Sequence, residues 1–170
     1  MDLKSYVRDV PDFPKPGIMF KDITPLLQDP LALRYAVDQL AEFGVPRRPD
    51  VILGAEARGF ILGAALAYSL GAGFVPARKP GKLPWRVSQA DYELEYGIDS
   101  LQMHQDAIRP GQRVIVHDDL LATGGTARAK IDLVEEAGGL VVGLAFLIEL
   151  PFLGGRGKLK GYDVLSLVTY

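Results

Sequence analysis

Short apolar runs recur along the chain, separated by segments in which apolar residues follow a helical period. The runs predict buried strands at 50–55, 74–78, 113–117, 140–148 and 162–168. The helical segments lie between them, at 30–44, 59–70 and 127–137. Buried strands that alternate with helices indicate an α/β fold with a mostly parallel sheet covered on both faces. Ligands of such sheets bind beyond the carboxyl ends of the strands, so chemistry is expected there.

The N-terminal part of the chain departs from this alternation. Residues 1–29 are rich in proline and are expected to be mostly irregular. Asp29 and Pro30 form a favourable cap and first turn for the helix that follows. The helical period predicts that this helix buries Leu33, Val37, Leu40 and Ala41.

Two further stretches of the chain differ from the alternation of strands and helices. Residues 79–92 show no periodicity and predict a long, mobile loop, and residues 93–103 alternate weakly, which suggests an antiparallel excursion. Residues 59–77 carry no charge and approach the length of a membrane span. Because glycines interrupt them around Gly71, they predict instead a buried helix, a glycine stop and a buried strand.

Composition limits the class of protein. The chain has 170 residues, enough for one domain with a full core, and 48% of them are hydrophobic and 24% charged. A net charge of −2 gives no basic surface for nucleic acid or an anionic membrane. The chain has no cysteine, which excludes disulfides, thiolate catalysis and cysteine-ligated zinc. A charged N-terminus without an apolar segment predicts a cytoplasmic protein.

The most informative motif follows the predicted strand at 113–117. Two adjacent acids, Asp118 and Asp119, come first, and a turn then opens the next helix with Ala122, Thr123, Gly124, Gly125 and Thr126. Such a turn at a helix N-terminus collects backbone N–H groups and the helix dipole around an anion. The acids suit sugar hydroxyls or a metal ion held beside the sugar. Together these residues predict a site for a ribose 5-phosphate group.

This motif resembles the site for 5-phosphoribosyl-1-pyrophosphate (PRPP) in type I phosphoribosyltransferases, in the form typical of the adenine phosphoribosyltransferases. The resemblance spans Phe13 to Tyr170. It implies a single domain over 1–170, with the type I phosphoribosyltransferase fold: a mostly parallel central sheet flanked by helices, a small hood at 1–29 and a flexible catalytic lid at 79–97. The implied reaction converts adenine and PRPP into AMP and pyrophosphate, in purine salvage.

A second segment, from Phe13 to Leu27, is similar to the hood of adenine phosphoribosyltransferases. The resemblance implies that Phe20 stacks on the adenine ring, while backbone groups around Met19 and Lys21 read the edge of the base. Taken alone, Phe20 is better explained as a core aromatic residue, but beside the PRPP motif the base-stacking role is favoured.

A third segment, 54–59, resembles the family's pyrophosphate loop. It carries Glu56 and Ala57 where many members have Asp and Ser, and the peptide between them is expected to be cis. Arg58 can grip phosphate oxygens with two hydrogen bonds. Its alternative reading is a surface residue at the start of a helix.

The fourth segment begins the lid with three cations, Arg78, Lys79 and Lys82, which suit the pyrophosphate of PRPP. Alone they also fit a solvated basic loop. The resemblance assigns Glu95 to proton transfer at the purine. The lid departs from the family at Trp85, Arg86 and Val87, where many members have Gly-Pro-Thr.

The resemblance also implies the cofactor and the assembly. Asp118 and Asp119 would hold the ribose hydroxyls and stabilise positive charge on the sugar. Mg²⁺ would be held mainly by PRPP and water near these two acids. Arg58, Lys79 and Lys82 would support the leaving group. The expected unit is a homodimer in which Lys79 reaches the neighbouring subunit, with adenine and PRPP as substrates and neither nucleic acid nor a membrane as partner.

Two alternatives remain open from the sequence. A phosphoribosyltransferase for guanine, hypoxanthine or xanthine would need a basic side chain to read the base, for which Lys158 or Lys160 is available. A non-catalytic PRPP-sensing regulator would carry an added DNA-binding domain, for which there are too few residues before Phe13. His117 stands where members usually have an apolar residue; it either packs in the core or tunes Asp118.

Overall fold

A five-stranded sheet forms the centre of the structure, a computed structural model that describes residues 1–93 and 97–170. Its strand order is β4-β3-β7-β8-β9. The strands are β3 (Val51–Ala55), β4 (Gly73–Ala77), β7 (Arg113–Leu121), β8 (Leu140–Glu149) and β9 (Val164–Thr169). Neighbouring strands pair in parallel throughout this sheet, which confirms the predicted α/β fold.

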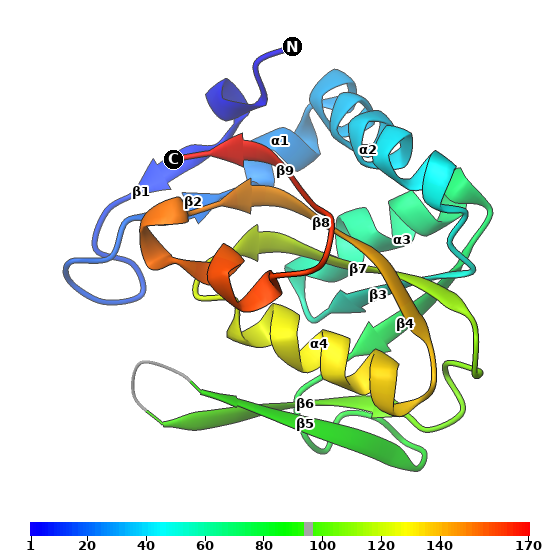
Figure 1. Ribbon diagram of the computed structural model, residues 1–170. Helices are drawn as coiled ribbons and strands as arrows, with labels where there is room; N and C mark the ends of the chain where they lie inside the picture. Colours follow the sequence, from blue (N-terminus) through cyan, green and yellow to red (C-terminus); the bar gives the residue numbers. More distant parts are fainter. Residues whose placement is uncertain (94–96) are drawn as a thin grey trace.

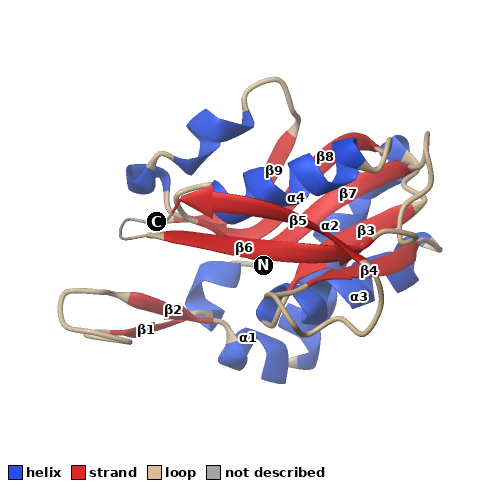
Figure 2. Ribbon diagram, turned by 90° about the horizontal axis from the view of Figure 1, so that it is seen from below, coloured by secondary structure: helices blue, strands red, loops and turns tan. Residues whose placement is uncertain are grey.

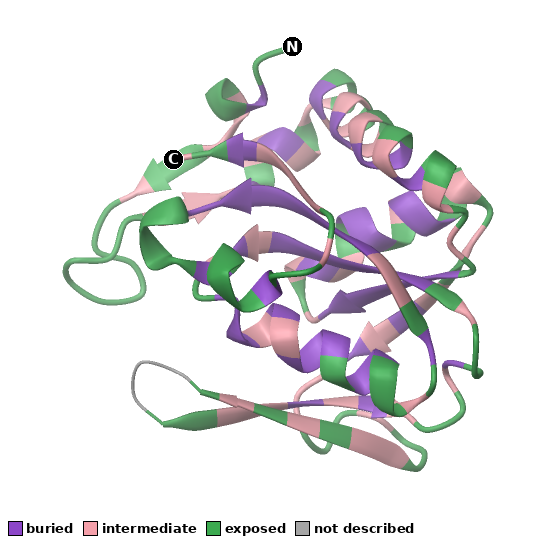
Figure 3. Ribbon diagram, in the orientation of Figure 1, coloured by how far each residue is buried: buried purple, intermediate pink, exposed green. Residues whose placement is uncertain are grey.

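Helices cover both faces of the sheet. α2 (Pro30–Gly44) and α3 (Arg58–Leu70) lie on one face, and α4 (Gly125–Glu136) lies on the other (Figure 1). Because strand residues alternate between faces, Ile52 and Ile115 pack with the first pair of helices, whereas Leu53 and Val116 pack with α4. The two resulting cores are buried on either side of the sheet (Figure 3).

The predicted cap of α2 is confirmed, and its predicted buried face is partly wrong. The Asp29 carboxylate accepts hydrogen bonds from the backbone N–H groups of Leu31 and Ala32, at 2.9 and 2.8 Å. The buried side chains are Ala32, Ala36, Leu40 and Ala41, while Leu33 and Val37 are half-buried. The helix is turned by about one residue from the prediction, so that its small alanines face the core, where α2 packs beside α3.

The N-terminal segment is more regular than its prolines indicated. It forms η1 (Leu3–Tyr6), the antiparallel pair β1 (Arg8–Val10) and β2 (Phe20–Asp22), and the short helix α1 (Thr24–Gln28). Three of the prolines lie in the connection between β1 and β2, and Pro25 lies in the first turn of α1, where proline fits a helix. The expectation of a mostly irregular segment was therefore wrong for these elements.

The expected loop at 79–92 was wrong for its second half. β5 (Val87–Glu93) pairs antiparallel with β6 (Ile98–His104), in register from Val87 opposite His104 to Glu93 opposite Ile98. This hairpin crosses beside α4 (Figure 2). It is held there because Ala90 and Tyr92 pack against the core on the α4 side. The antiparallel excursion is confirmed for β6, and the assigned lid acid Glu95 lies outside the described residues.

The remaining elements are short 3-10 turns: η2 (Val45–Arg47), η3 (Pro151–Leu153) and η4 (Gly155–Leu159). The uncharged stretch at 59–77 resolves as predicted into α3, a left-handed Gly71 with φ of 65°, and β4. Among the described residues, no helix has both the length and the apolar character needed to cross a membrane.

Candidate active site

A pocket of about 290 Å³ opens at the carboxyl ends of β3 and β7. Its walls come from the loop after β3, the end of β7 and the turn that begins α4, with Lys79 and Tyr92 closing one side. The predicted residues that line it are Glu56, Ala57, Arg58, Lys79, Asp118, Asp119, Ala122, Thr123, Gly124, Gly125 and Thr126. Segments far apart in the sequence therefore meet at the edge of the sheet where ligands were expected.

The turn at 122–126 is shaped by close contact with η4. Gly124 has φ of 79°, and a Cβ there would lie 2.5 Å from the carbonyl oxygen of Gly155. A Cβ on Gly155 would in turn lie 2.2 Å from the carbonyl oxygen of Ala122. Both positions therefore require glycine. Gly155 was not singled out by the sequence, although the adjacent glycines Gly154 and Gly155 could have indicated a close backbone contact.

Asp118 and Asp119 lie within β7 rather than after it, because the strand continues to Leu121. Both are largely buried, with 8% and 6% of their surface exposed. The Asp118 carboxylate accepts a hydrogen bond from Lys130 Nζ at 2.7 Å, and Arg58 Nε lies 2.9 Å from Asp119 Oδ2. Lys130 was not singled out by the sequence, in which it looks like an ordinary polar residue of α4.

The two acids differ in their electrostatic surroundings. Burial, reinforced by the negative charge of Asp118, raises the pKa of Asp119 to about 7, although Arg58 opposes this shift. The neighbouring His117 ring is fully buried, and burial lowers its pKa to about 4. His117 is therefore neutral at neutral pH and packs in the core, in agreement with the simpler of its two readings.

The peptide between Glu56 and Ala57 is cis, as predicted. The Glu56 carboxylate accepts hydrogen bonds from the backbone N–H of Lys79 at 2.6 Å and from Lys82 Nζ at 2.7 Å, and Arg78 Nε lies 3.5 Å away. Burial opposes ionisation, but these hydrogen bonds and charges hold the pKa of Glu56 below its usual value. Arg78 and Lys82 thus meet Glu56 at the rim of the pocket and do not line it.

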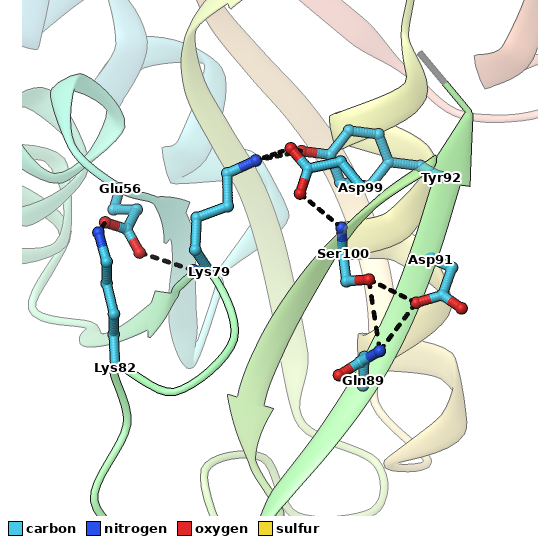
Figure 4. Close-up of polar contacts among 8 residues, drawn as sticks. All are labelled: Glu56, Lys79, Lys82, Gln89, Asp91, Tyr92, Asp99 and Ser100. Carbon is cyan, nitrogen blue, oxygen red and sulfur yellow. Dashed lines mark hydrogen bonds and ion pairs between the residues drawn. The ribbon is translucent and has the colours of Figure 1, made fainter. Parts of the chain in front are cut away.

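Lys79 connects the pocket to the β5–β6 hairpin, at the position where Tyr92 lies opposite Asp99. Its ammonium group contacts Asp99 and the hydroxyl of Tyr92, which in turn donates to Asp99 at 3.2 Å (Figure 4). On the same hairpin, Asp91 accepts a hydrogen bond from the hydroxyl of Ser100 at 2.7 Å, away from Lys79 (Figure 4). The cations predicted to bind pyrophosphate are therefore each paired with a carboxylate of their own chain.

The hood brings one of its three predicted residues towards the pocket. The Phe20 ring lies 4.8 Å from the guanidinium carbon of Arg58 and packs edge-on against Phe13. Met19 is exposed, and Lys21 pairs with Asp9 at 2.6 Å. None of the three hood residues belongs to the lining of the pocket.

The described residues contain no cluster of three or more His, Asp or Glu side chains that could hold a metal ion. Both oxygens of Asp118 already accept hydrogen bonds, from Lys130 and from the backbone N–H of Asp119. The two carboxylates of the site are therefore already engaged by donors and do not form a closed metal cage.

A family model and the similar solved structures point to the same protein family. Residues 31–163 match the phosphoribosyl transferase domain. The adenine phosphoribosyltransferase of Thermoanaerobacter pseudethanolicus is 56% identical, with a TM-score of 0.97, over 99% of this chain and 98% of that one. The enzyme of Rhodothermus marinus is 54% identical, with a TM-score of 0.95, over 99% and 96%. The Saccharomyces cerevisiae enzyme, solved with an imino-altritol bisphosphate and adenine, is 41% identical, with a TM-score of 0.91, over 98% and 96%.

Proposed function

The chain belongs to the phosphoribosyl transferase domain family, among its adenine phosphoribosyltransferases, and we propose that the pocket at the ends of β3 and β7 is its active site. The reaction of the chain is the transfer of the phosphoribosyl group of PRPP to adenine, which gives AMP and pyrophosphate. The observation that supports the pocket is the convergence of the acid pair, the glycine turn and Arg58 on one cavity.

The turn at 122–126 binds the 5-phosphate of PRPP. Its backbone N–H groups stand at the N-terminus of α4, where the helix dipole favours an anion. Thr123 and Thr126 add hydroxyl donors. Each charge-assisted hydrogen bond contributes about 1.5–3 kcal/mol, so several together anchor the sugar.

Asp118 and Asp119 accept hydrogen bonds from the 2- and 3-hydroxyls of the ribose. As the bond from C1 to pyrophosphate breaks and adenine attacks C1, positive charge develops on the sugar. The two buried carboxylates stabilise that charge because water is largely excluded from their surroundings. Arg58, which lines the same pocket, supports the negative charge of the leaving pyrophosphate. Lys79 lines the pocket of its own chain in this structure, and in the proposed dimer it would give the same support to the pocket of the neighbouring subunit.

Mg²⁺ is the cofactor. When bound, it neutralises charge on the pyrophosphate. Because Asp118 is engaged by Lys130 and Asp119 by Arg58, the residues present fit an ion carried mainly by PRPP and water beside the acids.

The hood and the lid complete the site around the base. Phe20, next to Arg58, stacks on adenine, and the backbone around Met19 and Lys21 reads its edge. Glu95 handles the proton of the purine. The chain acts as a single domain over 1–170, with 1–29 as hood and 79–97 as lid. Glu56 and Ala57 line the pyrophosphate subsite, and Arg78 and Lys82 stand at its rim.

The active unit is a homodimer in which Lys79 reaches the neighbouring subunit, and it acts in the cytoplasm. Ile61 and Tyr68, exposed at 47% and 90%, lie on α3 and would be covered by a second subunit. Mixing Lys79→Ala with Asp119→Asn tests this arrangement. Activity recovers in the mixture only if Lys79 serves a pocket on another chain. Light scattering and cell fractionation test the assembly and the location.

The test of the function is pyrophosphate release from PRPP and Mg²⁺ with adenine, guanine, hypoxanthine or xanthine as acceptor. Release with adenine and loss of release in Asp119→Asn are expected. A 6-oxopurine acceptor is not favoured, because the similar structures are adenine phosphoribosyltransferases. Full activity of Asp119→Asn would contradict the proposed site.

A further inference from the structure

Lys130 is a fully buried cation for which the reaction described above has no use. It lies on α4, and its side chain has 0% of its surface exposed. The residues around it on the same helix, Ala127, Ile131 and Val134, are buried and apolar. A buried ammonium group is strongly unfavourable unless charged or polar partners compensate for lost hydration. The partners of Lys130 must therefore compensate for the burial of its charge, and they indicate its role.

The two hydrogen-bond partners of the ammonium group belong to the acid end of β7. Lys130 Nζ donates a hydrogen bond to Asp118 Oδ2 at 2.7 Å and another to the carbonyl oxygen of His117 at 2.7 Å. The His117 side chain is neutral at neutral pH, because burial lowers its pKa to about 4. Lys130 is thus the cation that directly contacts Asp118.

The carboxylate of Asp118 is held on more than one side. Its second oxygen, Oδ1, accepts a hydrogen bond from the backbone N–H of Asp119 at 3.0 Å. Gly59, near the start of α3, is so close that a Cβ there would lie 2.6 Å from the same oxygen. The carboxylate is therefore clamped between α3 and α4 and has little freedom to rotate.

The contacts that fix Asp118 continue to Asp119, the acid that pairs with Arg58. Asp119 provides the N–H that bonds to Asp118, and its own Oδ2 lies 2.9 Å from Arg58 Nε. A continuous line of contacts runs from Lys130 in the core through Asp118 and Asp119 to Arg58 at the pocket. An apolar residue in place of a buried ion pair is often neutral or stabilising, so stability alone is a weak reason for this pair.

We propose that Lys130 is a positioning residue of the ribose subsite, which fixes the Asp118 carboxylate in the orientation that receives the hydroxyls of PRPP. The inference rests on the proposed function, in which this acid pair binds ribose. Lys130 does not touch the substrate. Its effect is to preorganise an acceptor that would otherwise have to be ordered when PRPP binds.

The absence of cysteine from the chain permits a direct test. In Lys130→Cys the single thiol of the unfolded chain is alkylated before refolding. Treatment with 2-bromoethylamine restores an ammonium group, with sulfur in place of one methylene. Treatment with iodoacetamide gives a neutral amide whose nitrogen is the same number of bonds from the backbone. The two forms differ in charge and little in length. Wild-type protein is refolded in parallel, and Arg128→Met removes a cation from the exposed side of α4 as a control.

The aminoethylated form is expected to have a KM for PRPP within about threefold of wild type. The neutral form is expected to raise that KM about tenfold or more, as for the loss of a charge-assisted hydrogen bond, with little change in the KM for adenine. Lys130→Met, expressed without refolding, should behave like the neutral form. Equal KM values for PRPP in the two alkylated forms would overturn the proposal.

Failure of the neutral variants to fold, as judged by circular dichroism, would also overturn it, because Lys130 would then be needed for folding alone. Asp119→Asn separates this inference from the proposed function. If Asp119→Asn is inactive while the neutral form at 130 binds PRPP normally, only the role of Lys130 fails. If Asp119→Asn is fully active, the proposed acid site itself fails.

Discussion

The two adjacent acids of the site have different partners. Asp118 is bonded to Lys130 from α4, and Asp119 to Arg58 from the start of α3. Both are nearly buried, and burial together with the charge of Asp118 disfavours ionisation of Asp119. The partner cations come from opposite faces of the sheet. This arrangement leaves Asp119, next to the pocket cation Arg58, as the acid whose charge responds to pH near neutrality.

The first prediction concerns that pH dependence. Burial and the charge of Asp118 raise the pKa of Asp119 to about 7. Because the ionised form is the better acceptor for ribose hydroxyls, kcat/KM for PRPP should fall as pH is lowered through 7. The profile is measured between about pH 5.5 and 8.5, within the range where His or a perturbed carboxyl titrates. A flat profile down to pH 6 would contradict the prediction.

Thermal melts across the same range provide the control. A pKa raised in the folded state means that folding favours the protonated acid, so this group's stability contribution is present below pH 4 and lost as pH rises through 7. Asp119 should therefore not destabilise the protein as pH falls from 8 to 6. Loss of activity in this interval would then reflect the site rather than unfolding.

The second prediction concerns Gly124. Alanine there would have to adopt φ of 79° and place its Cβ 2.5 Å from the Gly155 carbonyl oxygen. The change should lower stability by about 1–3 kcal/mol and raise the KM for PRPP, because the phosphate turn must shift. Gly157→Ala is a matched control in η4, since a Cβ there meets nothing within 4 Å. Equal effects of the two substitutions on Tm and KM would disprove this explanation.

At the scale of elements, the parallel strands and long helices were predictable and the hairpin was not. The strands of the central sheet are buried on both faces, so continuous apolar runs mark them. β5 buries only one side, where Ala90 and Tyr92 face α4, while charged residues such as Asp91 occupy the other side. The burial of β5 depends on its contact with α4, a tertiary contact that the sequence does not show. This segment of the sequence therefore looked like a loop.

The residues of the site also fall into those that could be predicted from the sequence and those that could not. The glycine turn and the acids could be predicted because their chemistry is local in sequence. The partners Lys130, Tyr92 and Asp99 could not be predicted. Each lies on another element, and the sequence does not show which way its side chain points in the folded chain. The extension of β7 to Leu121 was also missed, since the acids interrupt its apolar pattern.

The third prediction concerns Asp99, which lies opposite Tyr92 in the β5–β6 hairpin. Asp99 pairs with Lys79, which lines the pocket, so pyrophosphate must compete with this carboxylate for the ammonium group. Asp99→Asn should lower the inhibition constant of pyrophosphate by about two- to fivefold, a modest change because the pair is partly exposed. The constant is measured as product inhibition against PRPP.

Asp91→Asn is the matched control for this experiment. Asp91 lies on the same hairpin and bonds to Ser100 and Gln89, away from Lys79 (Figure 4). Its substitution should leave pyrophosphate inhibition unchanged. An increase in the inhibition constant in Asp99→Asn would instead mean that Asp99 orients Lys79 for binding rather than competing for it.

At the scale of the whole molecule, the C-terminus joins the hood to the edge of the central sheet. Lys4 Nζ donates to the carbonyl oxygen of Thr169 at 2.9 Å, and it also lies 4.1 Å from the centre of the Tyr170 ring. Lys21 of β2 lies 3.7 Å from the same ring. The hood therefore depends on contacts between the two ends of the chain, which no local pattern in the sequence could predict.

The last prediction uses Tyr170 to test what this connection does. Tyr170→Leu removes the aromatic face that two lysines contact, worth roughly 0.5–2 kcal/mol for each contact, with the higher value for the largely buried Lys21. Because Lys21 follows Phe20 on β2, loosening of the hood should raise the KM for adenine by about three- to tenfold and leave the KM for PRPP nearly unchanged.

Tyr170→Phe is the control: it keeps the ring and removes a buried hydroxyl that has no hydrogen-bond partner among the described residues. That variant should match wild type in both constants and be equally or more stable in thermal melts. A rise in the KM for PRPP of the same size as that for adenine would show that the C-terminus supports the whole sheet edge and not the hood in particular.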